Sequence, residues 1–322
     1  MFVVSQASSS PALDASSFPH LLDLVLSFSS LRVLLAFRNT SRLLKVKVDS
    51  VLERNGCHMR IVRGRNGSDP RIAYIDGDTV IVPTSRALIR FTRTVDIDNQ
   101  AVVHDHDIFG HLGSLGQNIK TLRVRHYYQS LGFQYLPFYP APPTCVISMN
   151  AFPLDSEPPP SLDCPTTLLD AHGTTKLVLI FVTSRDYQYP TITSHQRHTA
   201  SNFPSTLKEV VIIFSESTAP AHNLSSPKLA PENRVRLDKG IIFTLMGNNT
   251  RLKWTLVDCG PMIPPSEAAE AAGDDRHATA FKHVDRFISL TPPGFVSDIT
   301  CLRLDEYRKR VGDEQFRLDT FV

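Results

Sequence analysis

The residues whose types could best bind a metal or act in catalysis lie in the segment VVHDHDIFGHLGSLGQN, residues 102–118. His104 and His106 alternate with two aspartates, a pattern that in some binuclear metal hydrolases points two imidazoles at one ion. Such a site needs further ligands at consistent distances, and the nearest is His111 on a glycine-rich turn. We therefore expect a solvated acidic loop here, with metal binding as the alternative.

The adjoining residues GHLGSLG imitate the nucleophile elbow of serine hydrolases. A true elbow needs small residues two positions before and two after the serine, so that strand and helix can approach each other. Ser114 has Leu112 and Gly116 at those positions. We expect a turn that leads into a strand at Thr121, and a hydrolase using Ser114 or the His104/His106 pair is the alternative.

The densest basic patch is RIVRGRNGSDPRIAY, which contains Arg60, Arg63, Arg65 and Arg71. Runs of charge are usually solvated faces of a folded protein. A solvated face is therefore expected here, and a site for phosphate or an acidic partner is the alternative.

Other enzyme signatures are missing from the 322 residues. The chain has no phosphate-binding loop, no dinucleotide-binding glycine motif, no zinc-protease helix motif and no kinase catalytic loop. We therefore expect a non-enzymatic protein without catalytic residues, cofactor or bound metal.

Composition narrows the partners. Lys plus Arg number 34 and Asp plus Glu number 32, so the formal charge is only +2. The chain therefore lacks the clustered excess of positive charge with which proteins neutralise many phosphates. This argues against nucleic acid as its main partner. The most apolar stretch, residues 18–37, carries His20, Asp23 and Arg32, whose cost in a bilayer argues against a membrane span.

The cysteines indicate a reducing compartment. There are five, widely spaced and without a Cys-x-x-Cys pair, so they are expected to be free thiols. The first residues lack the basic and apolar regions of a signal peptide. We therefore expect a cytoplasmic or nuclear protein.

The elements divide the chain into three parts. Residues 1–17, rich in Ser, Ala and Pro, are expected to form a disordered tail. Residues 18–56 have helical spacing of apolar side chains, and Pro19, Ser29-Ser30 and Gly56 mark helix ends, which predicts three short helices. From residue 57 to 322 the apolar residues have the spacing of β-strands. The first strands are predicted to form a hairpin around Asp76-Gly77.

Short strands then recur at separations typical of repeat proteins. They are predicted at residues 94–97, 121–124, 145–149, 176–182, 209–214, 253–258 and 299–304. Runs such as KLVLIFV are apolar on both faces, which predicts a mostly parallel sheet. A polar turn and a basic residue precede several of them, as in HGTTKLVLI, which favours an irregular, leucine-rich-repeat-like α/β solenoid.

The remaining segments are predicted from their composition. Three proline-rich stretches, residues 152–165, 215–233 and 259–277, are expected to be loops. Trp254 lies in an apolar strand and is expected in the core. The end of the chain is predicted as a short charged helix to Val311, a break at Gly312, and a tail that Phe316 could dock.

The three predicted helices resemble an F-box. Phe18-Pro19 matches its opening, Leu22 and Leu26 its first helix, and Ser41-Arg42 the polar pair before its third helix. The second helix matches through Leu31, Leu34 and Leu35. The chain departs from the pattern in having Leu21 where an acidic residue is common, and in lacking the usual tryptophan of the third helix. As a whole, ending in EYRKRVGDEQFRL, it is similar to divergent F-box-like proteins of basidiomycete fungi.

The resemblance implies a substrate-recognition subunit of a cullin-RING (SCF-type) ubiquitin ligase. The F-box would bind the Skp-type adaptor protein, and the repeat domain would bind a protein substrate. By resemblance, the residues contacting the adaptor would be Pro19, Leu22, Leu26, Leu34 and Leu35. Two alternatives remain: a solenoid interaction scaffold whose helices only cap the first repeat, and the hydrolase considered above.

Overall fold

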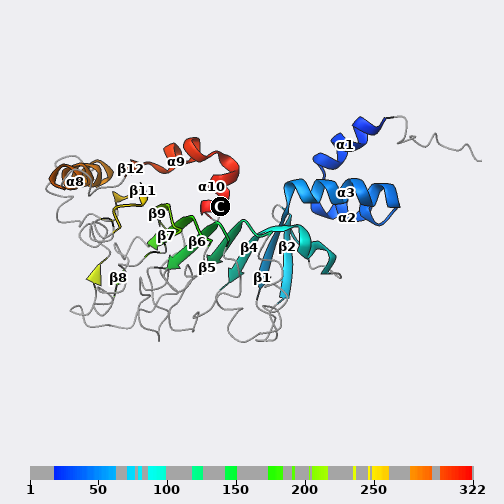
Figure 1. The fold of residues 1–322 in the computed structure, drawn as a ribbon, viewed down its shortest axis with the longest axis horizontal. Coiled ribbons are helices and arrows are strands. Elements are labelled where there is room, and N and C mark those ends of the chain that lie inside the picture. The colour runs from blue at the N-terminus through cyan, green and yellow to red at the C-terminus, as the bar shows by residue number, and fades with distance from the viewer. Residues whose placement is uncertain are drawn as a thin grey trace, which may run out of the picture.

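The computed structural model describes residues 18–62, 71–76, 79–81, 86–98, 118–125, 142–150, 173–183, 191–192, 203, 205–216, 235–236, 246, 249–260, 276–291 and 298–320. Within these residues the protein is an α/β structure with a mostly parallel sheet (Figure 1). The predicted α/β class and the parallel character of the sheet are confirmed.

Three helices begin the described chain. They are α1 (Pro19–Ser27), α2 (Leu31–Arg38) and α3 (Arg42–Asn55). Pro19 occupies the first turn of α1, where its missing N–H costs no helical hydrogen bond. The side chains of Ser30 and Ser41 accept hydrogen bonds from N–H groups in the first turns of α2 and α3, so each serine caps a helix. Gly56 ends α3 with a φ of 77°, a left-handed value that favours glycine.

Ten of the described strands form one sheet. They are β1 (Cys57–Val62), β2 (Arg71–Asp76), β3 (Thr79–Ile81), β4 (Thr92–Asp98), β5 (Thr121–Arg125), β6 (Thr144–Asn150), β7 (Lys176–Thr183), β9 (Glu209–Glu216), β11 (Lys253–Val257) and β12 (Ile299–Leu302). Their order across the sheet is β12-β11-β9-β7-β6-β5-β4-β1-β2-β3. From β1 to β12 all neighbours run parallel, while β2 and β3 add an antiparallel hairpin beside β1. The antiparallel hairpin predicted around Asp76-Gly77 is confirmed by the pairing of β2 with β3.

Two smaller elements complete the strand region. β8 (Thr191–Ile192) pairs with β10 (Val235–Arg236) in a separate antiparallel ribbon. The 3-10 helix η2 (Arg86–Phe91) leads directly into β4.

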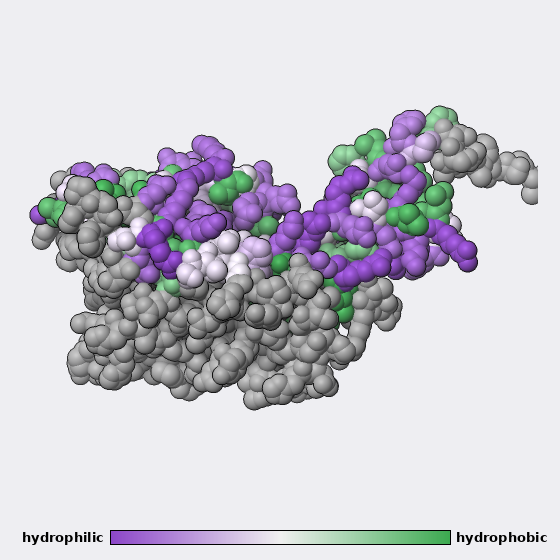
Figure 2. All heavy atoms as spheres, in the orientation of Figure 1, coloured by the Kyte–Doolittle hydropathy of each residue, from purple (hydrophilic) through white to green (hydrophobic). Residues whose placement is uncertain are grey.

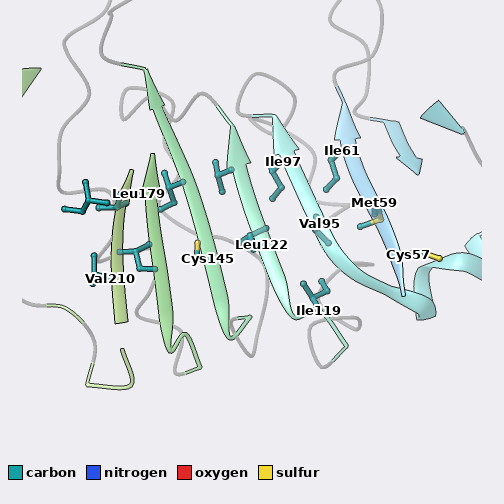
Figure 3. Close-up of a cluster of buried hydrophobic side chains, with 14 of the residues drawn as sticks. Cys57, Met59, Ile61, Val95, Ile97, Ile119, Leu122, Cys145, Leu179 and Val210 are labelled. Atoms are coloured by element: carbon teal, nitrogen blue, oxygen red, sulfur yellow. The ribbon is translucent and has the colours of Figure 1, made fainter. Parts of the chain in front are cut away.

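One face of the sheet carries a continuous apolar layer. Met59, Val95, Leu122 and Cys145 are lateral neighbours on β1, β4, β5 and β6, and all are buried. Figure 3 shows these side chains on the same side of the sheet. The layer extends to Trp254 on β11, which is fully buried as predicted.

The opposite face is covered in part by helices from the end of the chain. Val146, Val178 and Val211 form one lateral row and pack with Tyr307 and Phe316. These two aromatic residues belong to α9 (Leu304–Val311) and α10 (Asp313–Thr320). Central strands are therefore buried on both faces, which explains their continuous apolar runs.

The α8 helix (Arg276–Leu290) was not predicted. It packs on the first apolar layer through Ala280 and Val284, with Phe281 and Phe287 partly buried beside them. The apolar residues of α8 have helical spacing, but the small and charged residues that precede them in the sequence indicated a loop. The predicted break at Gly312 is confirmed by a positive φ of 81°, and the predicted tail beyond it forms α10.

Candidate functional site

Charged side chains attach the three N-terminal helices to the sheet. Asp49 on α3 accepts a hydrogen bond from Arg38 of α2 at 2.6 Å and pairs with Arg90 of η2 at 2.7 Å. At the end of β2, Asp76 accepts a hydrogen bond at 3.1 Å from the backbone N–H of Arg32, in the first turn of α2. Since Asp49 is only 16% exposed, this bridge is partly shielded from solvent.

An apolar contact reinforces this attachment. Leu31 of α2 and Leu52 of α3 are buried in the same cluster as Cys57 and Met59 of β1. Helices α2 and α3 and strand β1 therefore share one hydrophobic core.

The outer surface of the helices is unusually apolar. Eight of the ten exposed large apolar side chains in the described residues lie on or beside α1, α2 and α3. They are Phe18, Leu21, Leu24, Val25, Phe28, Val33, Leu43 and Val46. Figure 2 shows hydrophobic atoms gathered over these helices, whereas the surface of α9 and α10 is mainly hydrophilic. We call these eight side chains the apolar helical surface.

The α1 helix contributes most to this surface because it is apolar on two sides. Leu22 and Leu26 face inward, and Leu26 is fully buried. Leu21, Leu24 and Phe28 lie on other sides of the helix, and Phe28 is 83% exposed. A helix normally buries its apolar side chains, so α1, which is apolar on two sides and buries one, has apolar area in excess of what the described residues cover.

The structure gives the five predicted adaptor-contact residues different environments. Pro19 is exposed, and Leu22 and Leu35 are partly buried. Leu26 and Leu34 are buried, at 0% and 5% exposure, inside the packing of the helices. As folded here, a partner could reach the first three side chains but not the last two.

Sequence reasoning missed the exposed members of the apolar helical surface. The sequence predicted that the inward-facing leucines of α1 and α2 contact the adaptor, because these leucines carry the resemblance to an F-box. The second apolar stripe of α1, with Leu21, Leu24, Val25 and Phe28 at helical spacing, was the available signal.

A second candidate site lies on the strands next to the helices. Asp96 of β4 is fully buried, and its Oδ1 lies 3.1 Å from Nε of Arg123 on β5 and 2.9 Å from Nε2 of His58 on β1. Arg60, also on β1, is the lateral neighbour of Asp96. Four ionisable side chains thus meet on one face of three adjacent strands.

The buried thiols are poor nucleophiles. Burial raises the pKa of Cys57 and of Cys145 to about 12, and that of Cys259 rises further through the neighbouring Cys301 thiol and burial. A thiol with so high a pKa stays protonated near neutral pH, and the thiolate is the reactive form. The four cysteines in the described part of the chain are free, as predicted; Cys164 lies outside it.

The predicted catalytic alternatives lie outside the described residues. These are His104, His106, His111 and Ser114. Within the described residues, no group of three or more His, Cys, Asp or Glu is placed to hold a metal ion. Of the predicted basic patch, Arg60 is described with its side chain, Arg71 only as part of β2, and Arg63 and Arg65 lie outside.

None of the helices in the described ranges has the length and apolar character to cross a membrane. Comparisons with protein-family models, curated proteins and solved structures found no match to this chain. Functional conclusions therefore rest on its residues and their geometry.

Proposed function

We propose that this protein is a non-enzymatic adaptor that joins two other proteins. Helices α1–α3 act as an F-box-like module that binds the Skp-type adaptor of a cullin-RING ubiquitin ligase. The sheet domain acts as a leucine-rich-repeat-like solenoid that binds a protein substrate, in the cytoplasm or nucleus. The observation that carries the proposal is the apolar helical surface, which leaves large side chains exposed on or beside the three helices that resemble an F-box.

The energetics of the apolar helical surface support a protein partner. Removing apolar area from water stabilises a complex by roughly 25 cal/mol for each Å². Phe18 and Phe28 are 48% and 83% exposed, and aromatic side chains often dominate the binding energy of interfaces. Exposed apolar residues are normally scattered singly, so eight on three short helices favour a binding site.

Residue roles within the module follow from burial. Pro19, Leu22 and Leu35 remain proposed adaptor contacts, together with the eight side chains of the apolar helical surface. Leu26 and Leu34 would support that surface from inside, because they pack the helices against one another.

The arrangement of the sheet supports the solenoid. From β1 to β12 the parallel strands follow the order of the chain and never reverse direction across the sheet. Their first residues are 57, 92, 121, 144, 176, 209, 253 and 299, separations that fall in the repeat range of about 20 to 50 residues. A doubly wound sheet would instead reverse its strand order near the middle.

Co-purification with a Skp-type adaptor tests the proposal. The wild-type chain is expected to form a stable complex, and a Leu24→Asp, Phe28→Asp double variant to lose it, because both exposed side chains would carry charge into the interface. A matched control is Ile288→Asp, Leu290→Asp, which alters exposed apolar residues of α8 and is expected to bind normally. Circular dichroism should show all three proteins folded.

A second candidate function is a scaffold without a ligase role, in which α1–α3 only cap the end of the solenoid. The Asp49–Arg90 pair and the shared core with β1 favour it. Failure of the folded wild-type protein to bind the Skp-type adaptor would reject the ligase role and leave the scaffold.

A further inference from the structure

The chain turns sharply where β11 ends. Asp258, the residue after the strand, has a φ of 50° and is the one non-glycine residue with a positive φ among those that the structure describes. This conformation is uncommon outside glycine and persists where the surrounding structure enforces it. The backbone N–H of Asp258 donates to the carbonyl oxygen of Leu302 on β12 at 3.0 Å, and its carboxylate accepts from the N–H of Leu304 in α9 at 3.1 Å. Both bonds hold the turn against the segment that contains Cys301.

The turn brings two thiols together. Cys301 on β12 pairs laterally with Leu256 of the buried apolar layer, and its side chain packs against that layer. Cys259 directly follows Asp258, lies in the same layer, and donates a hydrogen bond from its thiol to the sulfur of Cys301. The two sulfurs are therefore in contact, although 42 positions separate them in the sequence.

Helix α8 fixes the other side of Cys259. The N–H of Gly260 donates to Nδ1 of His277, in the first turn of α8, at 3.2 Å. Since Asp258 is bonded to β12 and Gly260 to α8, the backbone is held on both sides of Cys259. A disulfide requires that the backbone bring two cysteine side chains together, and here their sulfurs already meet.

The two thiols differ in exposure. Cys259 is fully buried, whereas Cys301 is partly exposed. An oxidant from solvent therefore meets Cys301 first, and Cys259 is placed to react with the oxidised sulfur. Redox-sensing cysteines have this arrangement, an accessible thiol with a resolving cysteine beside it. Cys57 on β1 and Cys145 on β6 are buried on strands that are not neighbours, so they cannot pair with each other.

We propose that Cys259 and Cys301 form a peroxide-sensitive dithiol, which closes reversibly to a disulfide and fastens β12 and the starts of α8 and α9 to the end of β11. This inference goes beyond the proposed function and does not depend on it. In a reducing compartment such as the cytoplasm or nucleus, protein disulfides are usually transient and redox-sensing. Peroxide would close the pair there, and small thiol reductants would reopen it.

Hydrogen peroxide supplies the oxidising equivalents. The Cys301 thiolate attacks one peroxide oxygen, the O–O bond breaks, and the leaving hydroxide takes up the proton that the thiol lost to form water. Cys301 is then a sulfenic acid. The sulfur of Cys259 attacks the sulfur of Cys301, the S–O bond breaks, and the hydroxyl leaves with the proton of Cys259 as a second water. The two thiols lose two electrons, and one peroxide becomes two waters.

Peroxide treatment of the folded full-length chain, followed by alkylation of the remaining thiols and peptide mass spectrometry, tests the pair. The wild type should yield a peptide pair linked through Cys259 and Cys301, and dithiothreitol should restore both thiols. The oxidised protein should also unfold at a higher urea concentration than the reduced protein, because the new bond restricts the unfolded chain. Fluorescence of Trp254, on β11, reports this transition.

Three variants separate the roles of the two thiols. Cys259→Ala should prevent the disulfide and leave Cys301 as a sulfenic acid that dimedone captures. Cys301→Ala should leave Cys259 reduced, because its buried thiol does not meet the oxidant. Cys145→Ala, which removes a buried thiol of β6, is the matched control and should form the disulfide as the wild type does. The wild-type peptide map needs no variant, so it decides the test even where a variant does not fold.

Four outcomes would overturn the inference. Both thiols could stay free under peroxide that oxidises the urea-unfolded chain, or Cys301 could become a sulfinic acid while Cys259 stays free. Either residue could instead form a disulfide with another cysteine. Finally, the linked protein could unfold at the same or a lower urea concentration than the reduced protein. The Skp-type adaptor is absent from these assays, so their result is independent of the ligase role.

Discussion

At the scale of single residues, Asp319 of α10 illustrates how the end of the chain is held on the sheet. Its buried carboxylate accepts hydrogen bonds from Lys176 of β7 at 2.8 Å, from Gln315 at 2.8 Å, and from the hydroxyl of Tyr307. Burial and the charge of Asp319 hold the pKa of Tyr307 well above its ordinary value, so the phenol keeps its proton and remains a donor.

Asp319→Asn should therefore destabilise the protein strongly. The variant leaves the Lys176 ammonium, whose side chain is 17% exposed, without its carboxylate, and we expect the free energy of unfolding to fall by about 3 kcal/mol. Urea denaturation measures this change. Asp305→Asn is the control, because Asp305 lies exposed in the first turn of α9 and makes a 3.4 Å pair with Lys309, so its loss should cost less than about 1 kcal/mol. Equal losses in the two variants would contradict the role of Asp319.

At the scale of elements, the link between α3 and β1 depends on Gly56. Its φ of 77° and ψ of 169° belong to a backbone region used almost only by glycine. A Cβ built there would lie 2.6 Å from Cγ and Cδ of Arg93, whose guanidinium donates to the carbonyl oxygen of Glu53. Backbone strain and crowding therefore act together at this junction.

Gly312, between α9 and α10, provides a matched comparison for Gly56. It has nearly the same backbone angles, with φ 81° and ψ 160°, but a Cβ there would meet nothing within 4 Å. Gly312→Ala should cost roughly 1–3 kcal/mol from strain alone, and Gly56→Ala should cost more. Thermal and urea unfolding of both variants measure the difference in the free energy of unfolding. A smaller loss for Gly56→Ala than for Gly312→Ala would show that the Arg93 side chain moves aside at no cost.

At the scale of the whole molecule, one buried cluster joins the N-terminal helices to the far end of the sheet. It contains Leu52 of α3, Met59 of β1 and Trp254 of β11. Trp254 is the only tryptophan, so its fluorescence reports unfolding at the end of the sheet remote from the helices. Continuity of the core favours a single cooperative transition.

Leu52→Ala tests this continuity. The side chain is 2% exposed, and its truncation should lower the free energy of unfolding by about 3 kcal/mol. If the core is cooperative, the urea transition followed by Trp254 fluorescence should shift as much as the transition followed by circular dichroism. Leu43→Ala, at 60% exposure, should leave both transitions in place. A shift seen by circular dichroism alone would show that the helices unfold independently of the sheet.

Much of the element pattern could be predicted from local sequence. Helix ends at Pro19, Ser30 and Gly56, and apolar runs such as residues 176–182, depend on chemistry within a few positions along the chain. Burial on both faces of the central strands follows from those runs, which also indicated the parallel sheet. α8 was missed because its apolar stripe follows directly on residues 259–277, whose prolines and small residues predicted a loop.

The exposure of particular side chains depends on packing between distant segments. Leu26 lies in α1 and Phe28 directly follows the helix, yet Leu26 is fully buried and Phe28 is 83% exposed, because only one side of α1 meets the rest of the core. The row of Arg60, Asp96 and Arg123 is likewise assembled by strand register from residues 27 or more positions apart in the sequence. Local propensity determines where helices and strands begin, whereas lateral register and helix docking determine which side chains remain available to a partner, because those contacts link residues far apart in the chain.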